Sequence, residues 1–143
     1  MHERVAIRRR VLDDVVMHAA LESPMECCGL LVGPDDAADA AGERRITENV
    51  RCRNLRASPV AYLIDPVDHV AAIRRLRGSG RGVVGAYHSH PRSPAAPSET
   101  DLREAFYPEF IWLIASLAGE TPEVQAYCLS DGNFVPVRIV PVP

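Results

Sequence analysis

The sequence VVGAYHSHPRSPAAPSETD, residues 83–101, carries more information about this chain than any other stretch. It opens with an apolar run that ends in His-Ser-His, which predicts a buried strand over 83–90. The segment PRSPAAP predicts a stiff loop, because proline is a strong breaker of regular structure. A helix is predicted to begin at Ser98, a good N-cap residue. A strand, a stiff loop and a helix therefore follow one another within a short length of chain.

Two histidines and one aspartate in this stretch have the spacing of metal ligands. Residues two apart on a strand point to the same face, so His88 and His90 can present both imidazoles to one ion. Asp101 falls in the first turn of the next helix, one turn past Ser98. Two imidazoles and one carboxylate are typical of a catalytic zinc site, where the bound water has its pKa lowered to ~7. We therefore predict that His88, His90 and Asp101 bind zinc.

Each of these residues also has an ordinary structural interpretation. A single histidine at the end of a strand is usually structural, and Ser98 with Asp101 fits the S-x-x-[DE] capping pattern. We expect the cap to form as well, because the first turn of a helix is where a rigid ligand is needed. The combination of two histidines at strand spacing, a proline-rich loop and the Ser-Asp pair favours the metal site.

Hydrophobic periodicity on both sides of this stretch predicts further helices and strands. Helices are predicted over 8–23, 66–77 and 98–106, the second with Asp65 as N-cap and Pro66 in its first turn. Strands are predicted over 27–33, 44–54, 62–64, 83–90, 110–117, 123–130 and 134–140. Asp131-Gly132-Asn133 predicts a hairpin turn, and residues 34–43 a flexible acidic loop. We expect one domain over 1–143 of the α/β (α+β) class, with a central mixed β-sheet flanked by helices.

Composition excludes several functions. Sixteen basic and nineteen acidic residues give a net charge of −3, which argues against binding nucleic acid through its phosphates. The longest apolar run, FIWLIASLA, is too short to span a bilayer, and the first residues lack the apolar core of a signal peptide. We expect a cytoplasmic protein that does not bind membranes, with its four cysteines reduced.

The adjacent residues Cys27 and Cys28 allow three interpretations. A thiolate is a good zinc ligand, and a cysteine with a histidine can act as a nucleophile and its base. However, CCGLLV predicts a buried strand, in which cysteine behaves as a small apolar residue. We favour the packing role.

The metal-binding pattern resembles a known family. His88-Ser89-His90-Pro91, followed by Ser98 and Asp101, is similar to the H-x-H…S-x-x-D motif of the JAMM (MPN-plus) zinc metallopeptidases. Residues 24–33, PMECCGLLVG, resemble the P-x-E-x-C-G-x-L-x-G pattern of small bacterial members, and residues 62–66, YLIDP, show weaker similarity. The resemblance covers most of the chain and implies a JAMM/cytidine-deaminase-like fold.

The resemblance implies a role for each matching residue. His88, His90 and Asp101 would bind Zn²⁺. Glu26 would be the general base that takes a proton from the zinc-bound water, and Ser98 would hydrogen-bond the oxyanion. The residues alone support Glu26 only modestly, because Glu22 lies nearby; its position in the motif favours Glu26.

The resemblance also implies a substrate. It predicts hydrolysis of a peptide or isopeptide bond at the C-terminal Gly-Gly tail of a ubiquitin-like (β-grasp) sulfur-carrier protein. One alternative is an isopeptidase that deconjugates ubiquitin-like modifiers, and another is a non-catalytic MPN-type scaffold. A third is a zinc hydrolase of small molecules such as nucleosides, although the H-x-E and P-C-x-x-C motifs of deaminases are missing. The sequence leaves the oligomeric state open.

Overall fold

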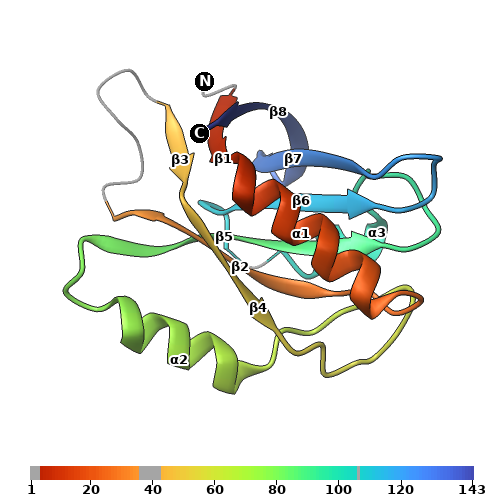
Figure 1. Cartoon of the computed structure of the whole chain (residues 1–143), viewed down its shortest axis with the longest axis horizontal. Helices are drawn as coiled ribbons and strands as arrows, with labels where there is room; N and C mark the ends of the chain where they lie inside the picture. Colours follow the sequence, from red (N-terminus) through yellow and green to blue (C-terminus); the bar gives the residue numbers. More distant parts are fainter. Residues whose placement is uncertain (1–3, 36–42, 106) are drawn as a thin grey trace.

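The computed structural model describes residues 4–35, 43–105 and 107–143, which form a mixed eight-stranded sheet with helices packed on it. The strand order is β3-β1-β8-β7-β6-β5-β2-β4. The elements within these residues are β1 Arg4–Arg8, α1 Arg9–Glu22, β2 Cys28–Pro34, β3 Arg44–Ile46, β4 Glu48–Cys52, α2 Pro66–Leu76, β5 Arg81–His90, α3 Glu99–Arg103, β6 Ile111–Ser116, β7 Glu123–Ser130 and β8 Asn133–Val142. Figure 1 shows their arrangement. This confirms the predicted fold class.

Strand β5 is an interior strand of the sheet and has different neighbours on its two sides. It pairs antiparallel with β2, placing Cys28 opposite His88, and parallel with β6, placing Ile114 beside the same histidine. The side chain of Tyr87 points to one face of the sheet, and those of Ala86 and His88 point to the other. The alternation along β5 therefore determines which of its residues reach each face.

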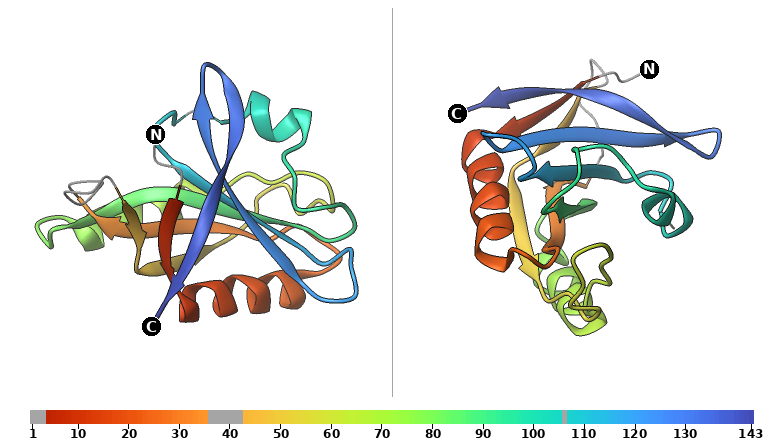
Figure 2. Two further views of the ribbon diagram at one scale, coloured as in Figure 1. Left: turned by 90° about the horizontal axis from the view of Figure 1, so that it is seen from above. Right: turned by 90° about the vertical axis from the view of Figure 1, so that its right-hand side faces the viewer.

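The two faces are covered by different helices. Helix α1 packs Val11, Val15 and Ala19 against the face that carries Tyr87. On the opposite face, Ala72 of α2 packs on Leu30 and Cys28 of β2. The right-hand view of Figure 2 shows α1 and α3 on opposite sides of the sheet. Because α1 seals its own face, a site accessible to a substrate has to form on the other one.

Gly29 of β2 shows how closely the strands pack beneath α1. A Cβ atom at this position would overlap the ring of Tyr87 and the carbonyl oxygen of Val50. The glycine in the Cys28-Gly29 pair is therefore required for close approach of neighbouring groups, not for an unusual backbone conformation.

Several predictions are confirmed in detail. Helix α2 begins as expected: the Asp65 side chain accepts a hydrogen bond from the Val67 amide, and Pro66 occupies the first turn. The hairpin between β7 and β8 turns at Asp131 and Gly132, both with positive φ, as a two-residue type I′ turn requires.

Among the helices of residues 4–35, 43–105 and 107–143, none combines the length and the hydrophobicity of a membrane-spanning segment.

Other predictions were wrong or incomplete. The strand β1 was missed; it forms because it pairs with β3 and β8 and buries Val5 and Ile7. The strand predicted over 44–54 is two strands, since β3 pairs with β1 whereas β4 pairs with β2.

The strand predicted over 62–64 does not form. Only Ile64 makes an isolated bridge, to Asn54. The segment is held by scattered backbone hydrogen bonds, such as that from the Leu55 amide to the Leu63 carbonyl, and by the side chain of Asn54. Helix α3 ends at Arg103, short of the predicted 106, and Phe106 lies outside the described residues. Most of the acidic loop predicted over 34–43 also lies outside them.

Candidate metal centre and active site

The structure brings His88, His90 and Asp101 together on the face of the sheet opposite α1. Each offers one ligand atom, and these three atoms lie within 4.8 Å of one another. His88 Nε2 is 3.1 Å from Asp101 Oδ1, and His90 Nε2 is 3.2 Å from Asp101 Oδ2. All three side chains are buried. The arrangement has the donor set and the compactness that a divalent transition metal requires.

Local hydrogen bonds hold Asp101 and His90 in place. The Asp101 amide donates to Ser98 Oγ at 3.0 Å, and the Ser98 amide donates to Asp101 Oδ2 at 2.9 Å. This is the reciprocal capping box, so the predicted cap is confirmed. His90 Nδ1 lies 2.8 Å from the carbonyl oxygen of Pro94, to which it can only donate. The proton on Nδ1 leaves Nε2 as a free acceptor, the form in which histidine binds metal.

The contacts within the cluster are incomplete without a cation. His90 Nε2 and Asp101 Oδ2 are both acceptors when His90 carries its proton on Nδ1, and two acceptors 3.2 Å apart repel. In His88, neither ring nitrogen makes a hydrogen bond of acceptable geometry, although the ring is 1% exposed. Buried polar atoms without a partner are costly and need an explanation. A metal ion on the two Nε2 atoms and the carboxylate would satisfy most of these groups.

Electrostatics favour the ligand forms of Asp101 and His88, whereas in the metal-free cluster they favour a proton on His90. Burial raises the pKa of Asp101, but contacts with His88 and His90 outweigh it and hold the pKa well below its usual range. Burial lowers the pKa of His88, which favours the neutral imidazole. Burial also acts to lower the pKa of His90, yet the contact with Asp101 raises it overall. An ionised carboxylate and neutral imidazoles are the states in which these groups bind metal.

Glu26 is buried next to the cluster, in the residues just before β2. Its side chain is 3% exposed, and Oε1 has no hydrogen-bond partner. Burial raises the pKa of its carboxyl to about 8; the charge of His90 opposes this rise and that of Asp101 adds to it. A carboxyl with its pKa near neutrality can both accept and donate a proton, as a general base and acid must.

Ser98 and the cysteines can now be placed. Ser98 is exposed at the start of α3; its Oγ accepts from Asp101, so its own O–H remains available to donate. Cys27 and Cys28 are free, buried and outside the metal cluster. Burial raises the pKa of Cys27 to about 11 and that of Cys28 further. A thiol so reluctant to ionise is a poor nucleophile, which favours the packing role.

Comparison with known proteins agrees with this geometry. The family model described as prokaryotic homologs of the JAB domain matches residues 8–129. The chain belongs to this family. The resemblance to the JAMM metallopeptidases drawn from the motifs is therefore confirmed.

Three relatives of this JAB-family chain have names that describe a reaction. A desampylase of Haloferax volcanii is 36% identical over 121 residues, covering 81% of this chain and 83% of its own. A probable TtuB-protein conjugate cleaving protease of Thermus thermophilus is 30% identical, with 94% and 82% covered. A CysO-cysteine peptidase of Mycobacterium tuberculosis is 29% identical, with 95% and 91% covered.

A solved structure shares the fold of this JAB-family chain. The solution structure of protein DSY2949 from Desulfitobacterium hafniense superimposes with a TM-score of 0.85 at 29% identity, covering 96% of this chain and 92% of that one. The name of that protein describes no activity, so the likeness supports the fold and not the reaction.

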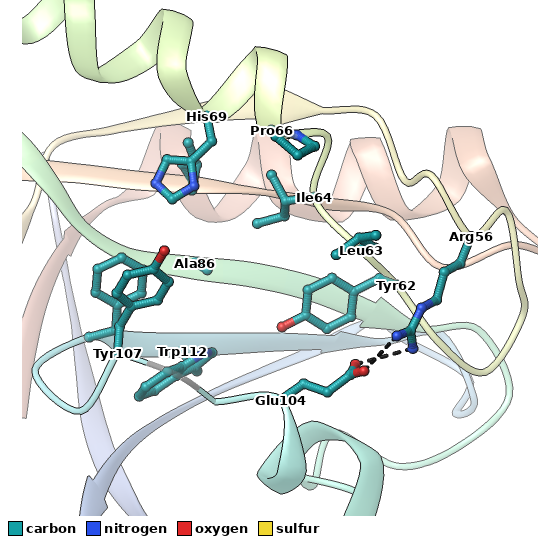
Figure 3. Close-up of a pocket in the computed structure, with 12 residues that line it drawn as sticks. Arg56, Tyr62, Leu63, Ile64, Pro66, His69, Ala86, Glu104, Tyr107 and Trp112 are labelled. Atoms are coloured by element: carbon teal, nitrogen blue, oxygen red, sulfur yellow. Dashed lines mark hydrogen bonds and ion pairs between the residues drawn. The ribbon is translucent and has the colours of Figure 1, made fainter.

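An apolar pocket of about 460 Å³ adjoins the metal cluster on the same face of the sheet (Figure 3). Ala86 and Trp112, neighbours across β5 and β6, form part of its lining. Tyr62 also lines the pocket and stacks on His88, with ring centroids 4.4 Å apart and planes 19° apart. Figure 3 shows Arg56 and Glu104 facing each other, joined by an ion pair of 2.6 Å. The Tyr62 ring therefore lies between this pocket and His88.

Sequence reasoning missed part of this lining. Trp112 falls in the strand predicted over 110–117; its side chain is buried, but it also lines the pocket. Tyr62 was predicted on a strand, whereas its ring lies on His88. The weak family resemblance of residues 62–66 was the available signal, and spacing cannot show that Tyr62 and His88, so far apart in sequence, touch.

Proposed function

We propose that this JAB-family chain is a zinc-dependent metallopeptidase acting at the C-terminal Gly-Gly tail of a ubiquitin-like (β-grasp) sulfur-carrier protein. One observation carries the proposal: the buried cluster His88–His90–Asp101 has unpaired ligand atoms, and a buried carboxyl, Glu26, lies beside it without a partner for Oε1. Zinc fits this mixture of two imidazoles and one carboxylate, which leaves a coordination position open. When bound, it would supply Lewis acidity and lower the pKa of a water molecule.

Glu26 is the proposed proton carrier. Its carboxylate takes the proton from the attacking water and later delivers it to the nitrogen of the leaving amine. Its raised pKa of about 8 suits both halves of this transfer at neutral pH. The absence of a hydrogen-bond partner on Oε1 leaves that oxygen free to meet the water.

Ser98 is the proposed oxyanion donor. Its Oγ is fixed by the Asp101 amide at 3.0 Å, while the hydroxyl proton is not needed for the cap. A fixed donor beside the reacting carbonyl stabilises the charge that develops on oxygen in the transition state. Ser98 therefore combines a structural and a catalytic role.

The relatives support a substrate with a ubiquitin-like body. The named reactions are cleavage of CysO-cysteine, cleavage of TtuB-protein conjugates and desampylation. The first matches processing of a sulfur carrier, and the second favours a second candidate function, an isopeptidase that deconjugates ubiquitin-like modifiers. A non-catalytic scaffold agrees poorly with a chain that retains all three ligands and Glu26.

Intact-mass analysis with zinc-loaded protein tests the proposal. The substrates are β-grasp sulfur carriers extended past Gly-Gly, a conjugate of a ubiquitin-like modifier, and casein as the control. We expect the extension to be removed, and Glu26→Gln to retain zinc while turnover falls by about 10³-fold or more. Glu22→Gln is the matched control, because Glu22 precedes Glu26 closely in the chain but has an exposed carboxyl. This variant should have the activity of wild type.

Three results would revise the proposal. Cleavage of the conjugate alone would make the deconjugating enzyme the better description. Full activity of Glu26→Gln would reject Glu26 as the base. Stoichiometric zinc without cleavage of any substrate would reject the proposed reaction while leaving the metal site.

A further inference from the structure

Asn54, which lies between β4 and α2, makes a hydrogen bond with every donor and acceptor of its side-chain amide. Its Nδ2 donates to the carbonyl oxygens of Glu26, at 3.0 Å, and Ala61, at 3.1 Å. Its Oδ1 accepts from the amides of Arg56, at 3.0 Å, and Leu63, at 2.9 Å. These four bonds also determine which end of the side-chain amide is Nδ2 and which is Oδ1. If the amide were flipped, Oδ1 would face two carbonyl oxygens and Nδ2 would face two N–H groups, so no hydrogen bond would remain.

The backbone of Glu26 is held by this part of the chain. Its amide donates to the Ser58 carbonyl at 2.8 Å, and its carbonyl accepts from Asn54. The next residue, Cys27, bonds through its amide to Ser89 Oγ at 2.7 Å, between the two histidine ligands. Glu26 thus lies between the segment 54–58 and the end of β5. Since Oε1 makes no hydrogen bond, these backbone contacts set the position from which the buried carboxyl projects.

The same amide also holds Tyr62. Asn54 contacts the residue before the tyrosine through Ala61 and the residue after it through Leu63. The Tyr62 ring stacks on His88, which has no hydrogen bond of its own to fix its orientation. One side chain therefore bridges the segment that carries the proposed base and the segment that supports a proposed metal ligand.

We propose that Asn54 is a positioning residue of the active site, which sets Glu26 and Tyr62 relative to the His88–His90–Asp101 cluster. This inference rests on the proposed function for its effect on turnover, but the positioning itself can be measured without a substrate. Asn54 touches no reacting atom; it acts through Glu26 and Tyr62 alone.

Three variants separate positioning from general stability. Asn54→Ala removes all four hydrogen bonds. Asn54→Asp keeps an acceptor for Arg56 and Leu63 but, when ionised, faces the carbonyls of Glu26 and Ala61 with a second acceptor. Ser58→Ala is the matched control: it removes the Oγ that accepts from the Val60 amide at 3.1 Å and leaves the carbonyl that holds Glu26.

Turnover is measured on zinc-loaded protein at pH 8, where an aspartate is ionised. We expect kcat of Asn54→Asp to fall by about ten-fold or more while KM changes by less than about three-fold. Zinc should stay at one per chain. Asn54→Ala should lower kcat similarly. It should also raise KM, because Tyr62, which lines the pocket, is no longer held through Ala61 and Leu63. Ser58→Ala should keep kcat within about two-fold of wild type.

Amide hydrogen exchange followed by NMR gives the readout that needs no substrate. In Asn54→Ala, the amides of Glu26, Arg56 and Leu63 should exchange about ten-fold faster or more, while that of Val15 in α1 stays unchanged. In Asn54→Asp, the amides of Arg56 and Leu63 should exchange as slowly as in wild type, because the carboxylate still accepts their hydrogen bonds. Unchanged exchange at Glu26 in Asn54→Ala would overturn the positioning role. So would wild-type kcat in Asn54→Asp.

The two proposals fail in different ways. If wild type cleaves no substrate, the proposed function fails and the exchange result alone decides the role of Asn54. If wild type cleaves and Glu26→Gln does not, but Asn54→Asp retains wild-type kcat, only the positioning role is lost.

Discussion

His18 and His88 are both buried histidines, but their side chains lie on opposite faces of the sheet. They differ in whether their ring nitrogens have a hydrogen-bond partner. His18 of α1 is 2.8 Å from the hydroxyl of Tyr87 and meets its ring edge-on. His88 has no hydrogen bond at either ring nitrogen, yet it faces Asp101 and stacks on Tyr62. A buried polar group with its partner present belongs to the core. One whose partner is missing indicates a site for a ligand.

The largest expected difference between these histidines is in zinc binding. His88→Ala should reduce bound zinc to well below one per chain and lower turnover by roughly 10³-fold, since a catalytic zinc needs its third protein ligand. His18→Ala should keep one zinc, because its ring faces away from the cluster. Elemental analysis of the purified proteins measures both. A full zinc complement in His88→Ala would refute the proposed ligand set.

In the metal-free protein, the two histidines should differ less, and replacing His18 should now be the more harmful change to the free energy of unfolding. Replacing His88 with Leu removes two unpaired nitrogens from the interior, so the free energy of unfolding should stay the same or rise by ~1–2 kcal/mol. His18→Leu loses the hydrogen bond to Tyr87 and should lower the free energy of unfolding by ~1–2 kcal/mol. Urea unfolding in the presence of a chelator measures both. Equal destabilisation by the two substitutions would show that His88 is as well satisfied as His18.

The smallest expected effect is on the pH dependence of stability. Burial lowers the pKa of His18 from its ordinary value of 6.5, with the charge of Arg51 acting in the same direction. The unfolded chain therefore binds this proton more readily than the folded protein. The contribution of His18 to stability is complete above pH 6.5 and is lost as the pH falls through its lowered folded-state pKa.

Comparison of wild type with His18→Gln isolates this effect from other titrating groups. Between pH 7 and 5, stability of wild type should fall more steeply, by at most about 1.4 kcal/mol per pH unit. Urea midpoints across this range provide the measurement. Parallel curves for the two proteins would mean that His18 titrates alike in the folded and unfolded states.

Local spacing was sufficient for three of the proposed site residues. The alternation of a strand puts His88 and His90 on one face, and the S-x-x-D cap places Asp101 in the first turn of α3. These relations extend over a few residues, so the sequence alone specifies them. The residues alone supported Glu26 only modestly, and the resemblance to a family favoured it over Glu22. What brings it to the cluster is the antiparallel register that sets Cys28 opposite His88.

Long-range pairing explains what was missed. Strand β1 exists because it pairs with β8 at the other end of the chain, and nothing within Arg4–Arg8 indicates that partner. The segment around Tyr62 has the composition of a strand, but it forms only one isolated bridge, and the side chain of Asn54 bonds to the residues on both sides of Tyr62. Intrinsic β-propensity is weak, and tertiary contacts override it.

Periodicity and neighbouring residues were enough to predict the mixed α/β class, the spacing of His88, His90 and Asp101, the cap of α2 and the hairpin at Asp131-Gly132. Three features depend instead on long-range contacts: Glu26 is buried beside the cluster, Tyr62 stacks on His88, and Asn54 links them. These contacts join segments that are far apart in the sequence, and their separation along the chain does not show that they are neighbours in space. They form when β2, β4 and β5 pair in register and expel water from the face opposite α1.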